Sequence, residues 1–293
     1  MHIVVPATAG DGSDVLARTI AKSLTESMGQ SFVIDNEPGA GGSLAADAVA
    51  KAAPDGYTIF LANGSTHGPT PSLYPNLPYD SVRDFAPITM ISSAADVLVV
   101  GAGVRASNVA EFIALVKRQP GKMTLASAGN GSISHLSAEL LKSMAGIDVL
   151  HVPYKGASPA LVDVASGQVD GMVINIPTVL PLLQGGKLKI LGVTSLKPAA
   201  SLPHVPTLDA SGVPGYETTA WFGFMVPAKR PPEIVQALYT KTRQALAQPE
   251  VKATLARQGA EPADMTPLEF SAFVRNHIAK YAKVIKDANV KLE

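Results

Sequence analysis

The chain lacks cysteine altogether, and this absence excludes disulfide bonds, thiolate metal sites and cysteine nucleophiles. It also lacks an excess of charge of either sign, because 24 Lys and Arg residues balance 24 Asp and Glu residues. A chain without a basic surplus has no electrostatic footprint for nucleic acid, so we expect a small-molecule ligand. No apolar run approaches the roughly 18 residues that a membrane span requires. We therefore predict a soluble chain without direct membrane insertion.

The 293 residues, 46% of them hydrophobic, are sufficient for two cores of ordinary size. Short strand-like runs alternate with helix-like stretches, which is typical of an α/β protein. The first series has strands in HIVV, FVID and YTIFLA and helices over 13–28 and 42–52. A second series begins near residue 107 and alternates helices and strands as far as LKILGVTS, which ends at residue 195.

Two apolar stretches, 85–103 and 220–228, are long enough to pass from one α/β unit to the other. After the second stretch the sequence predicts only helices, over 231–248, 250–258 and 267–288. We therefore expect a discontinuous first domain, 1–100 plus 226–293, and a second domain, 101–225. The ligand cleft is expected between them, since ligands of α/β proteins bind beyond the carboxyl ends of the strands.

The segment VVPATAGDGSD, residues 4–14, runs from a strand through small residues into a helix with Ser13 or Asp14 at the N-cap. Such a loop leaves helix N-terminal amides open to an anion. LASAGNGSISH, residues 125–135, repeats the arrangement, and LANGSTHGPTPS adds a polar loop after a third strand. Tight βα turns alone would also account for small residues in either loop. Four charge-assisted hydrogen bonds of about 1.5 to 3 kcal/mol each could supply the roughly 8 kcal/mol of micromolar binding.

Other motifs are incomplete. GNGSIS has serine where a dinucleotide fingerprint has its third glycine, and PGAGGS lacks the lysine of a phosphate loop. The six histidines show no metal-ligand spacing, so neither a metal nor a cofactor is predicted. His135, near a helix start, is expected to be a loop hydrogen-bonder, and His151 a structural strand residue.

A series of collinear segments resembles the substrate receptors of tripartite tricarboxylate transporters, the Bug or TctC family. The resemblance spans essentially the whole chain. The segments are IVVPATAGDGSDVLAR, NEPGAGGS, PDGYTIFLANGSTH, LPYDSVRDFAPI, ASAGNGSISHLSAELLKSMAG, HVPYKG, GQVDGMV, LPHVPTLDASGVPGYE and WFGFMVPA.

The resemblance implies a two-domain, periplasmic-binding-protein-like (Venus flytrap) α/β fold. Each domain would be a mixed β-sheet flanked by helices, with two crossover strands as the hinge. It implies a periplasmic, non-enzymatic receptor that binds a small carboxylate and delivers it to the membrane subunits of the transporter. A cleaved signal peptide is implied too, and because the first residues lack one we expect a mature chain. A monomer is expected.

The resemblance also implies ligand-binding positions in five segments. Three departures from the family pattern concern them: Ala7 replaces an aromatic residue, Asp11 a glycine, and Ile174 an aspartate. Without that aspartate an ammonium group loses its partner, so we predict a carboxylate lacking an ammonium group, either aromatic or a dicarboxylate. Asp11 either faces the ligand or is a solvated loop tip. The implied ligand-binding residues are Ala7, Thr8, Ala9, Gly10, Gly12, Ser13, Asp14, Asn63, Ser65, Thr66, His67, Ser127, Ala128, Gly129, Asn130, Ser132, Tyr154, Lys155, Gly156, Ile174 and Asn175.

Two other functions remain open from the residues. One is an esterase-type hydrolase, with Ser65 or Ser132 as nucleophile and His67 or His135 as base. Against it, GSTHG does not lead directly into a helix as a nucleophile elbow would. The other is a cytoplasmic ligand sensor that signals to a partner protein.

Overall fold

The computed structural model describes residues 1–7, 9–10, 12–39, 42–74, 76–154, 156–257 and 259–291. The chain divides into two compact units, and each is described by itself. Unit 1 comprises Met1–Ser93 and Trp221–Ala282, and unit 2 comprises Ala94–Ala220 and Lys283–Glu293. Two of the three boundaries therefore fall within strands, β4 (Phe85–Gly101) and β9 (Thr219–Pro227), and the third falls within helix α10 (Pro267–Asp287).

Unit 1 is built on sheet A, whose strand order is β2-β1-β3-β9-β4. Strands β1, β2 and β3 are parallel, and β9 runs antiparallel to β3. The short strand β10 pairs antiparallel with β4 at Ser92 and Ser93. The remaining bounds are β1 His2–Val5, β2 Val33–Asn36, β3 Thr58–Asn63 and β10 Glu261–Pro262.

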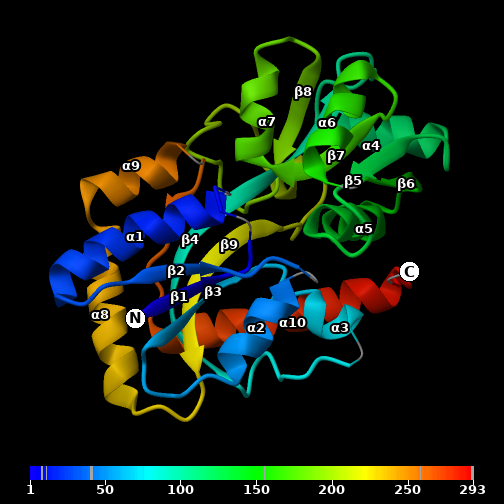
Figure 1. Ribbon diagram of the computed structural model, residues 1–293. Helices are drawn as coiled ribbons and strands as arrows, with labels where there is room; N and C mark the ends of the chain where they lie inside the picture. The colour runs from blue at the N-terminus through cyan, green and yellow to red at the C-terminus, as the bar shows by residue number, and fades with distance from the viewer. Residues whose placement is uncertain are drawn as a thin grey trace. The chain divides into compact units, whose positions relative to one another are not determined.

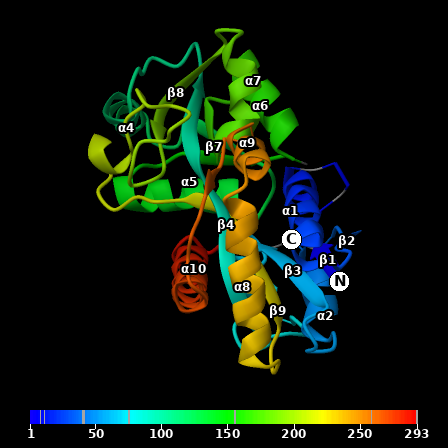
Figure 2. The ribbon, with the colours of Figure 1, turned by 90° about the vertical axis from the view of Figure 1, so that its left-hand side faces the viewer.

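Side chains along sheet A alternate between two apolar clusters, as a strand period of two requires. Ile59 and Leu61 of β3 belong to the cluster with α1, α8 and α9, and Phe60 belongs to the cluster with α2 and α10. Figure 2 shows α8 and α10 on different sides of β4. The helices of unit 1 are α1 Gly12–Met28, α2 Ser43–Ala50, α3 Thr70–Leu73, α8 Pro232–Leu246, α9 Pro249–Arg257 and most of α10 Pro267–Asp287.

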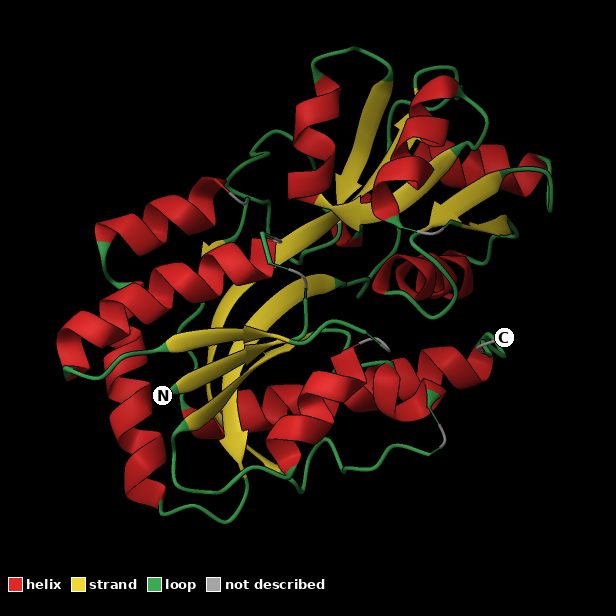
Figure 3. Ribbon diagram, in the orientation of Figure 1, coloured by secondary structure: helices red, strands yellow, loops and turns green. Residues whose placement is uncertain are grey.

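Unit 2 is built on sheet B, in which the second half of β4 is followed by β7, β5 and β6, with β8 also paired to β4. Strands β5, β6 and β7 are parallel, whereas β4 runs antiparallel to β7 and β8. Helices lie along the strands of the unit (Figures 1 and 3). The bounds are α4 Val109–Arg118, β5 Thr124–Ser127, α5 Ile133–Ala145, β6 Leu150–Pro153, α6 Ala157–Ser166, β7 Gly171–Asn175, α7 Ile176–Leu183 and β8 Leu188–Val193.

The two faces of sheet B also carry separate cores. Leu98 and Val173 pack in one cluster with α4 and α5, and Val97 and Ile174 pack in the other with α6 and α7. This alternation in β4 and β7 fixes which residues can point toward a given face of unit 2.

The prediction of mixed α/β units, each a sheet flanked by helices, is confirmed. The prediction that only helices follow residue 228 was wrong, because β10 lies between α9 and α10. A two-residue strand that contains Pro262 carries no period-two pattern, so no local signal could have revealed it. Among the described residues, no helix combines the length and hydropathy that crossing a membrane would require.

Candidate functional site

The predicted ligand loops follow the carboxyl ends of parallel strands in both units. In sheet A, the registers of β1 with β2 and β3 place Val5, Asn36 and Asn63 at or near one edge. The loops after these strands therefore share that edge, where α/β proteins bind ligands.

Asp14 organises the first loop. It is only 2% exposed, and its carboxylate accepts hydrogen bonds from the backbone N–H of Gly10 at 2.8 Å, Arg18 Nε at 3.0 Å and Asn36 Nδ2 at 3.0 Å. Asn36 also donates to the carbonyl of Ala7 at 3.1 Å. The carboxylate is thus bound within unit 1, and we infer that Asp14 shapes the loop that precedes α1. Sequence reasoning missed Arg18 and Asn36, although the Asp14–Arg18 spacing of four residues was a readable signal.

Replacing Asp14 with asparagine is expected to lower the free energy of unfolding by about 1 to 2 kcal/mol, because charged hydrogen bonds become neutral ones. Burial raises the pKa of Asp14, but the bonds from Arg18, Gly10 and Asn36 outweigh it and leave that pKa below its usual value. Urea unfolding at pH 7 measures the change. The control is Asp264→Asn, because the Arg243–Asp264 pair is also an Arg–carboxylate pair but is largely exposed. Equal losses for both variants would contradict the assigned role.

The loop after β3 is organised by Asn63. Its side-chain oxygen accepts hydrogen bonds from the backbone N–H groups of Ser65 and Thr66, both at 3.0 Å, which closes a tight turn. Thr66 and His67 are fully buried, and the His67 ring packs against Phe60 and Phe85 at centroid distances of 5.9 and 5.1 Å. The structure thus places His67 under the loop, leaving Asn63 and Ser65 as its more accessible members.

Gly42, the residue before α2, joins these two loops. Its φ of 87° is left-handed, and a Cβ atom there would lie 2.5 Å from Thr66 Cγ2 and 3.0 Å from Pro6 Cβ. Only glycine allows this approach without movement of its neighbours. The start of α2 therefore packs against both predicted ligand loops of unit 1.

The predicted loop of unit 2 lies between β5 and α5. Ser132 caps α5, since its hydroxyl accepts from the His135 N–H at 3.3 Å and donates to the Gly129 carbonyl at 2.7 Å. The Ala128 N–H donates to Ser134 Oγ at 2.9 Å. Ala128, Gly129, Asn130 and Ser132 are all partly exposed, so this loop keeps an accessible backbone.

Two further predicted segments share that edge of sheet B. The Tyr154 N–H donates to the Ser127 carbonyl at 3.0 Å, and the Tyr154 hydroxyl donates to Asp163 at 2.6 Å. Gly156 precedes α6, and Asn175 caps α7 by accepting from the Thr178 N–H at 3.1 Å. The N-termini of α5, α6 and α7 therefore follow three strands whose carboxyl ends share one edge, an arrangement that favours an anion.

Ile174 and Asn175 face opposite sides of sheet B. The Ile174 side chain is 3% exposed and lies in the α6–α7 core cluster. Asn175 pairs in register with Asp96 of β4, and directly opposed residues in an antiparallel pair present their side chains on the same face. The structure thus adds a carboxyl group, Asp96, that sequence reasoning did not consider. It lies inside a mostly apolar stretch, and only tertiary pairing places it beside Asn175.

In neither serine–histidine pair of the hydrolase alternative does a ring nitrogen of the histidine hydrogen-bond to the serine hydroxyl among the described residues. His67 Nδ1 interacts with Thr66 Oγ1 at 3.0 Å, and His135 Nδ1 accepts from the Gly131 N–H at 3.1 Å. His135 is therefore a loop hydrogen-bonder, as predicted. A different pair, Ser127 Oγ and His151 Nε2, lies at 2.6 Å. Ser127 is fully buried, so its hydroxyl is closed to a substrate.

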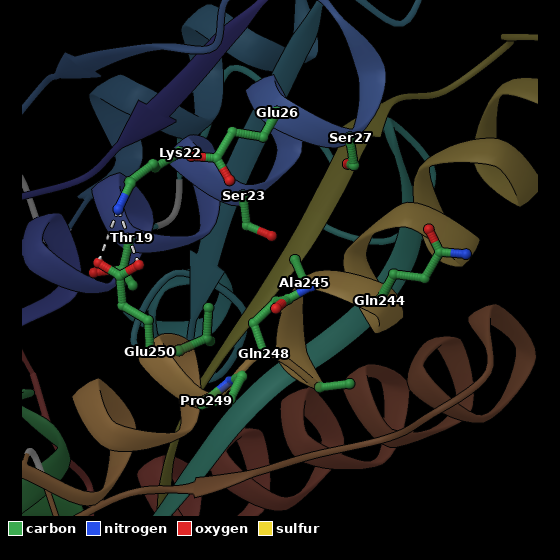
Figure 4. Close-up of a pocket in the computed structure, with 12 residues that line it drawn as sticks. Thr19, Lys22, Ser23, Glu26, Ser27, Gln244, Ala245, Gln248, Pro249 and Glu250 are labelled. Atoms are coloured by element: carbon green, nitrogen blue, oxygen red, sulfur yellow. Dashed lines mark hydrogen bonds and ion pairs between the residues drawn. The ribbon is translucent and has the colours of Figure 1, made fainter.

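A cavity of ≈ 720 Å³ opens elsewhere in unit 1, where α1, α8 and α9 meet (Figure 4). The Lys22 ammonium points at the Glu250 carboxylate across it, at 3.0 Å. None of the predicted ligand residues lines this cavity. Among the described residues, no group of three or more His, Asp or Glu side chains could hold a metal ion.

Three predicted positions, Thr8, Asp11 and Lys155, lie outside the described residues.

Comparison with known proteins identifies the family. Residues 16–290 match the model of the tripartite tricarboxylate transporter family receptor, TctC. Rpa4515 of R. palustris was solved with adipate and is 38% identical to this chain. The match covers 99% of this chain and 97% of that one, with a TM-score of 0.84. MatC (Rpa3494) of Rhodopseudomonas palustris was solved with bound malate and is 33% identical to this chain. The match covers 97% of this chain and 98% of that one, with a TM-score of 0.80.

A third structure, the periplasmic binding protein BugD, is 33% identical, covering 100% of this chain and 98% of its own, with a TM-score of 0.80. The predicted periplasmic-binding-protein-like fold is therefore confirmed. With a family match over almost the whole chain, this protein belongs to the receptors of the tripartite tricarboxylate transporter family.

Proposed function

We propose that this receptor acts in the periplasm, binds a small carboxylate and delivers it to the membrane subunits of a tripartite tricarboxylate transporter, without catalysing a reaction. One observation carries the proposal: the predicted ligand residues follow parallel strands and precede α1, α5, α6 and α7 at their N-termini. The partial positive charge at the N-termini of these helices favours a negative ligand.

The chemistry of the described loops suits a carboxylate bound by neutral groups. Asn130 and Ser65 are partly exposed, and their side-chain amide and hydroxyl are neutral hydrogen-bond donors. Asp14, by contrast, already uses its carboxylate within unit 1. We propose ligand contacts by the partly exposed loop residues of both units, among them Asn63, Ser65, Ala128 and Asn130, and domain limits at 100/101 and 225/226.

We further propose that the ligand lacks an ammonium group. Two relatives were solved with adipate and malate, both dicarboxylates without nitrogen. Position 174 is an isoleucine within an apolar cluster, so it offers no charge to an ammonium group. These observations favour a dicarboxylate over an amino acid and leave an aromatic acid to be tested beside it.

A thermal-shift screen tests the proposal. Adipate, malate and benzoate represent the proposed classes, glutamate and aspartate carry the added ammonium, and adipamide is the uncharged control. A binding acid at 100 times its Kd is expected to stabilise the fold by about 2.7 kcal/mol. The bound acid should be recovered chemically unchanged.

Two results would count against the proposal. Tight binding of glutamate or aspartate in calorimetry would overturn the prediction on the ammonium group. Stabilisation by adipamide as strong as that by adipate would overturn anion recognition itself.

A further inference from the structure

Two histidines that the proposed function does not use are stacked behind the unit 2 loop. The rings of His135, from α5, and His151, from β6, have a centroid distance of 3.7 Å and an interplanar angle of 5°. His135 is 7% exposed, and His151 is partly buried. Each ring is stacked on the other, and each also contacts the loop 127–132.

The pair is connected to both glycines that bend the loop. On one side, the Gly131 N–H donates to His135 Nδ1 at 3.1 Å. On the other, His151 Nε2 lies 2.6 Å from Ser127 Oγ, which accepts from the Gly129 N–H and donates to the Gly129 carbonyl, both at 3.1 Å. Both glycines have left-handed backbones, with φ of 132° at Gly129 and 73° at Gly131. Glycine leaves the left-handed backbone free of side-chain restraint, so hydrogen bonds to the loop, those of the histidine pair among them, help to set where its amides point.

The hydrogen bond from Gly131 determines the protonation of His135. A ring nitrogen that accepts a hydrogen bond carries no proton, so the single proton of neutral His135 is on Nε2. Nε2 lies 3.8 Å from Glu139 Oε1. A second proton would have to occupy Nδ1, where it would oppose the N–H of Gly131. A doubly protonated His135 therefore cannot hold Gly131.

The surroundings of the pair favour neutral rings. The charged side chains that act on it are Glu139 and Lys142, both on α5 and paired with each other at 2.8 Å. Burial, with Lys142 acting in the same direction, lowers the pKa of His135 to about 4. Burial, together with the neighbouring His135, lowers the pKa of His151 to about 4. At neutral pH both rings are uncharged and the contacts to the loop are intact.

We propose that the His135–His151 pair positions the loop 127–132 for ligand binding, and that protonation of His135 releases Gly131 and weakens that binding. The part of this inference that concerns affinity rests on the proposed function. The part that concerns the loop does not, and it can be measured without any ligand.

The ligand-free test follows the backbone amide of Gly131 by NMR. As the pH falls from 7 to 3.5, its resonance is expected to shift together with the ring signals of His135, and its protection from hydrogen exchange should fall. In His135→Phe, which keeps a ring for stacking but lacks Nδ1, protection at pH 7 should fall up to about tenfold, as for loss of one neutral hydrogen bond. His204→Gln is the matched control, because His204 is an exposed histidine of the same unit.

The binding test uses calorimetry with adipate and malate. Both acids take up protons themselves between pH 6 and 4, so the readout is the ratio of the His135→Phe Kd to the wild-type Kd at each pH. That ratio is expected to be up to about tenfold at pH 6 and to fall by about half at pH 4, where about half of wild-type His135 is protonated. A residue that merely supported the fold would leave the ratio the same at both pH values.

The outcomes separate the two proposals. Binding of neither acid by the wild type would count against the proposed function, and the Gly131 measurement would still decide the loop's dependence on His135. A Gly131 resonance that does not follow the His135 titration in the wild type would overturn the inference, even if His135→Phe fails to fold.

Discussion

Replacing Gly68 with alanine is expected to lower the free energy of unfolding by about 3 kcal/mol or more. Gly68 is buried in the loop after β3, and a Cβ atom there would lie 2.3 Å from the Gly64 carbonyl oxygen and 2.9 Å from two atoms of the His277 ring. The first contact is with backbone, so it cannot be relieved by a side-chain rotation. Overpacking of this kind typically lowers the free energy of unfolding by about 1 to 3 kcal/mol. Because the clashing backbone atom cannot rotate away, we expect a loss at or above the upper end of that range.

The displaced groups are connected to the core of unit 1. His277 Nε2 lies 3.2 Å from Trp221 Nε1 and 3.3 Å from the Gly64 carbonyl oxygen. Movement of the loop therefore disturbs the cluster around Trp221, which is 1% exposed.

Chemical denaturation monitored by tryptophan fluorescence measures the loss, because Trp221 is the chain's single tryptophan. The matched control is Gly103→Ala. Gly103 is exposed, and a Cβ atom there meets nothing within 4 Å. A Gly68→Ala protein as stable as Gly103→Ala would show that the loop rearranges freely.

Replacing Asp96 with asparagine is expected to stabilise the protein above pH 7, by about 1 to 4 kcal/mol at pH 8. Asp96 is 3% exposed, and its Oδ2 has no hydrogen bond of normal geometry among the described residues. Burial raises the pKa of Asp96 to about 7, although the Thr218 hydroxyl acts in the opposite direction. Asparagine keeps the shape of the side chain and has no charge to bury.

Proton binding determines how the stability of the wild-type protein changes with pH. Between about pH 4 and 7 the folded protein holds a proton on Asp96 that the unfolded chain has lost, so stability falls as the pH rises through this window. Above pH 7 the folded protein carries the full cost of burying the Asp96 charge. At about 1.4 kcal/mol per pKa unit, the size of the pKa shift limits this cost to about 4 kcal/mol. Below pH 4 both states are protonated and the variant should match the wild type.

Urea unfolding of wild type and Asp96→Asn at pH 4.5 and pH 8 measures the difference. Any effect of the buried histidines is common to both proteins and cancels. Asp170→Asn is the control, because the Asp170 carboxylate accepts from the Thr124 N–H at 2.8 Å and its hydroxyl at 2.9 Å and should lose stability when neutralised. An Asp96→Asn advantage that is absent at pH 8, or equal at both pH values, would refute the assigned ionisation.

The elements of the fold were predictable where local pattern sets them. Short apolar runs such as Ile59, Phe60 and Leu61 indicated strands, and the stretches between them indicated helices. The apolar stretch that became β4 was recognised as a crossing, but its partners were not, because pairing depends on residues far along the chain. For the same reason no local signal announced β10.

The site was predictable at the level of loops and less so at the level of side chains. Strand ends and small residues located the loops correctly after β1, β3 and β5. They could not show that His67 is fully buried or that Ile174 faces a core cluster, since orientation depends on tertiary packing. The contacts of Asn36 and Asp96 join segments that are distant in sequence, and a single sequence contains no record of them.

Strand β4 supplies residues to both sheets without a break, with Ser92 and Ser93 paired to β10 and Asp96 to Val100 paired to β7. Removing or adding one residue anywhere along β4 would turn every β4 side chain on one side of the change to the opposite face of the sheet. Leu98 and Val100 would exchange faces with Val97 and Val99, or Ala86 and Ile88 would leave their cluster. Changes in chain length among descendants of this protein should therefore accumulate in segments such as 76–84 and avoid 85–101.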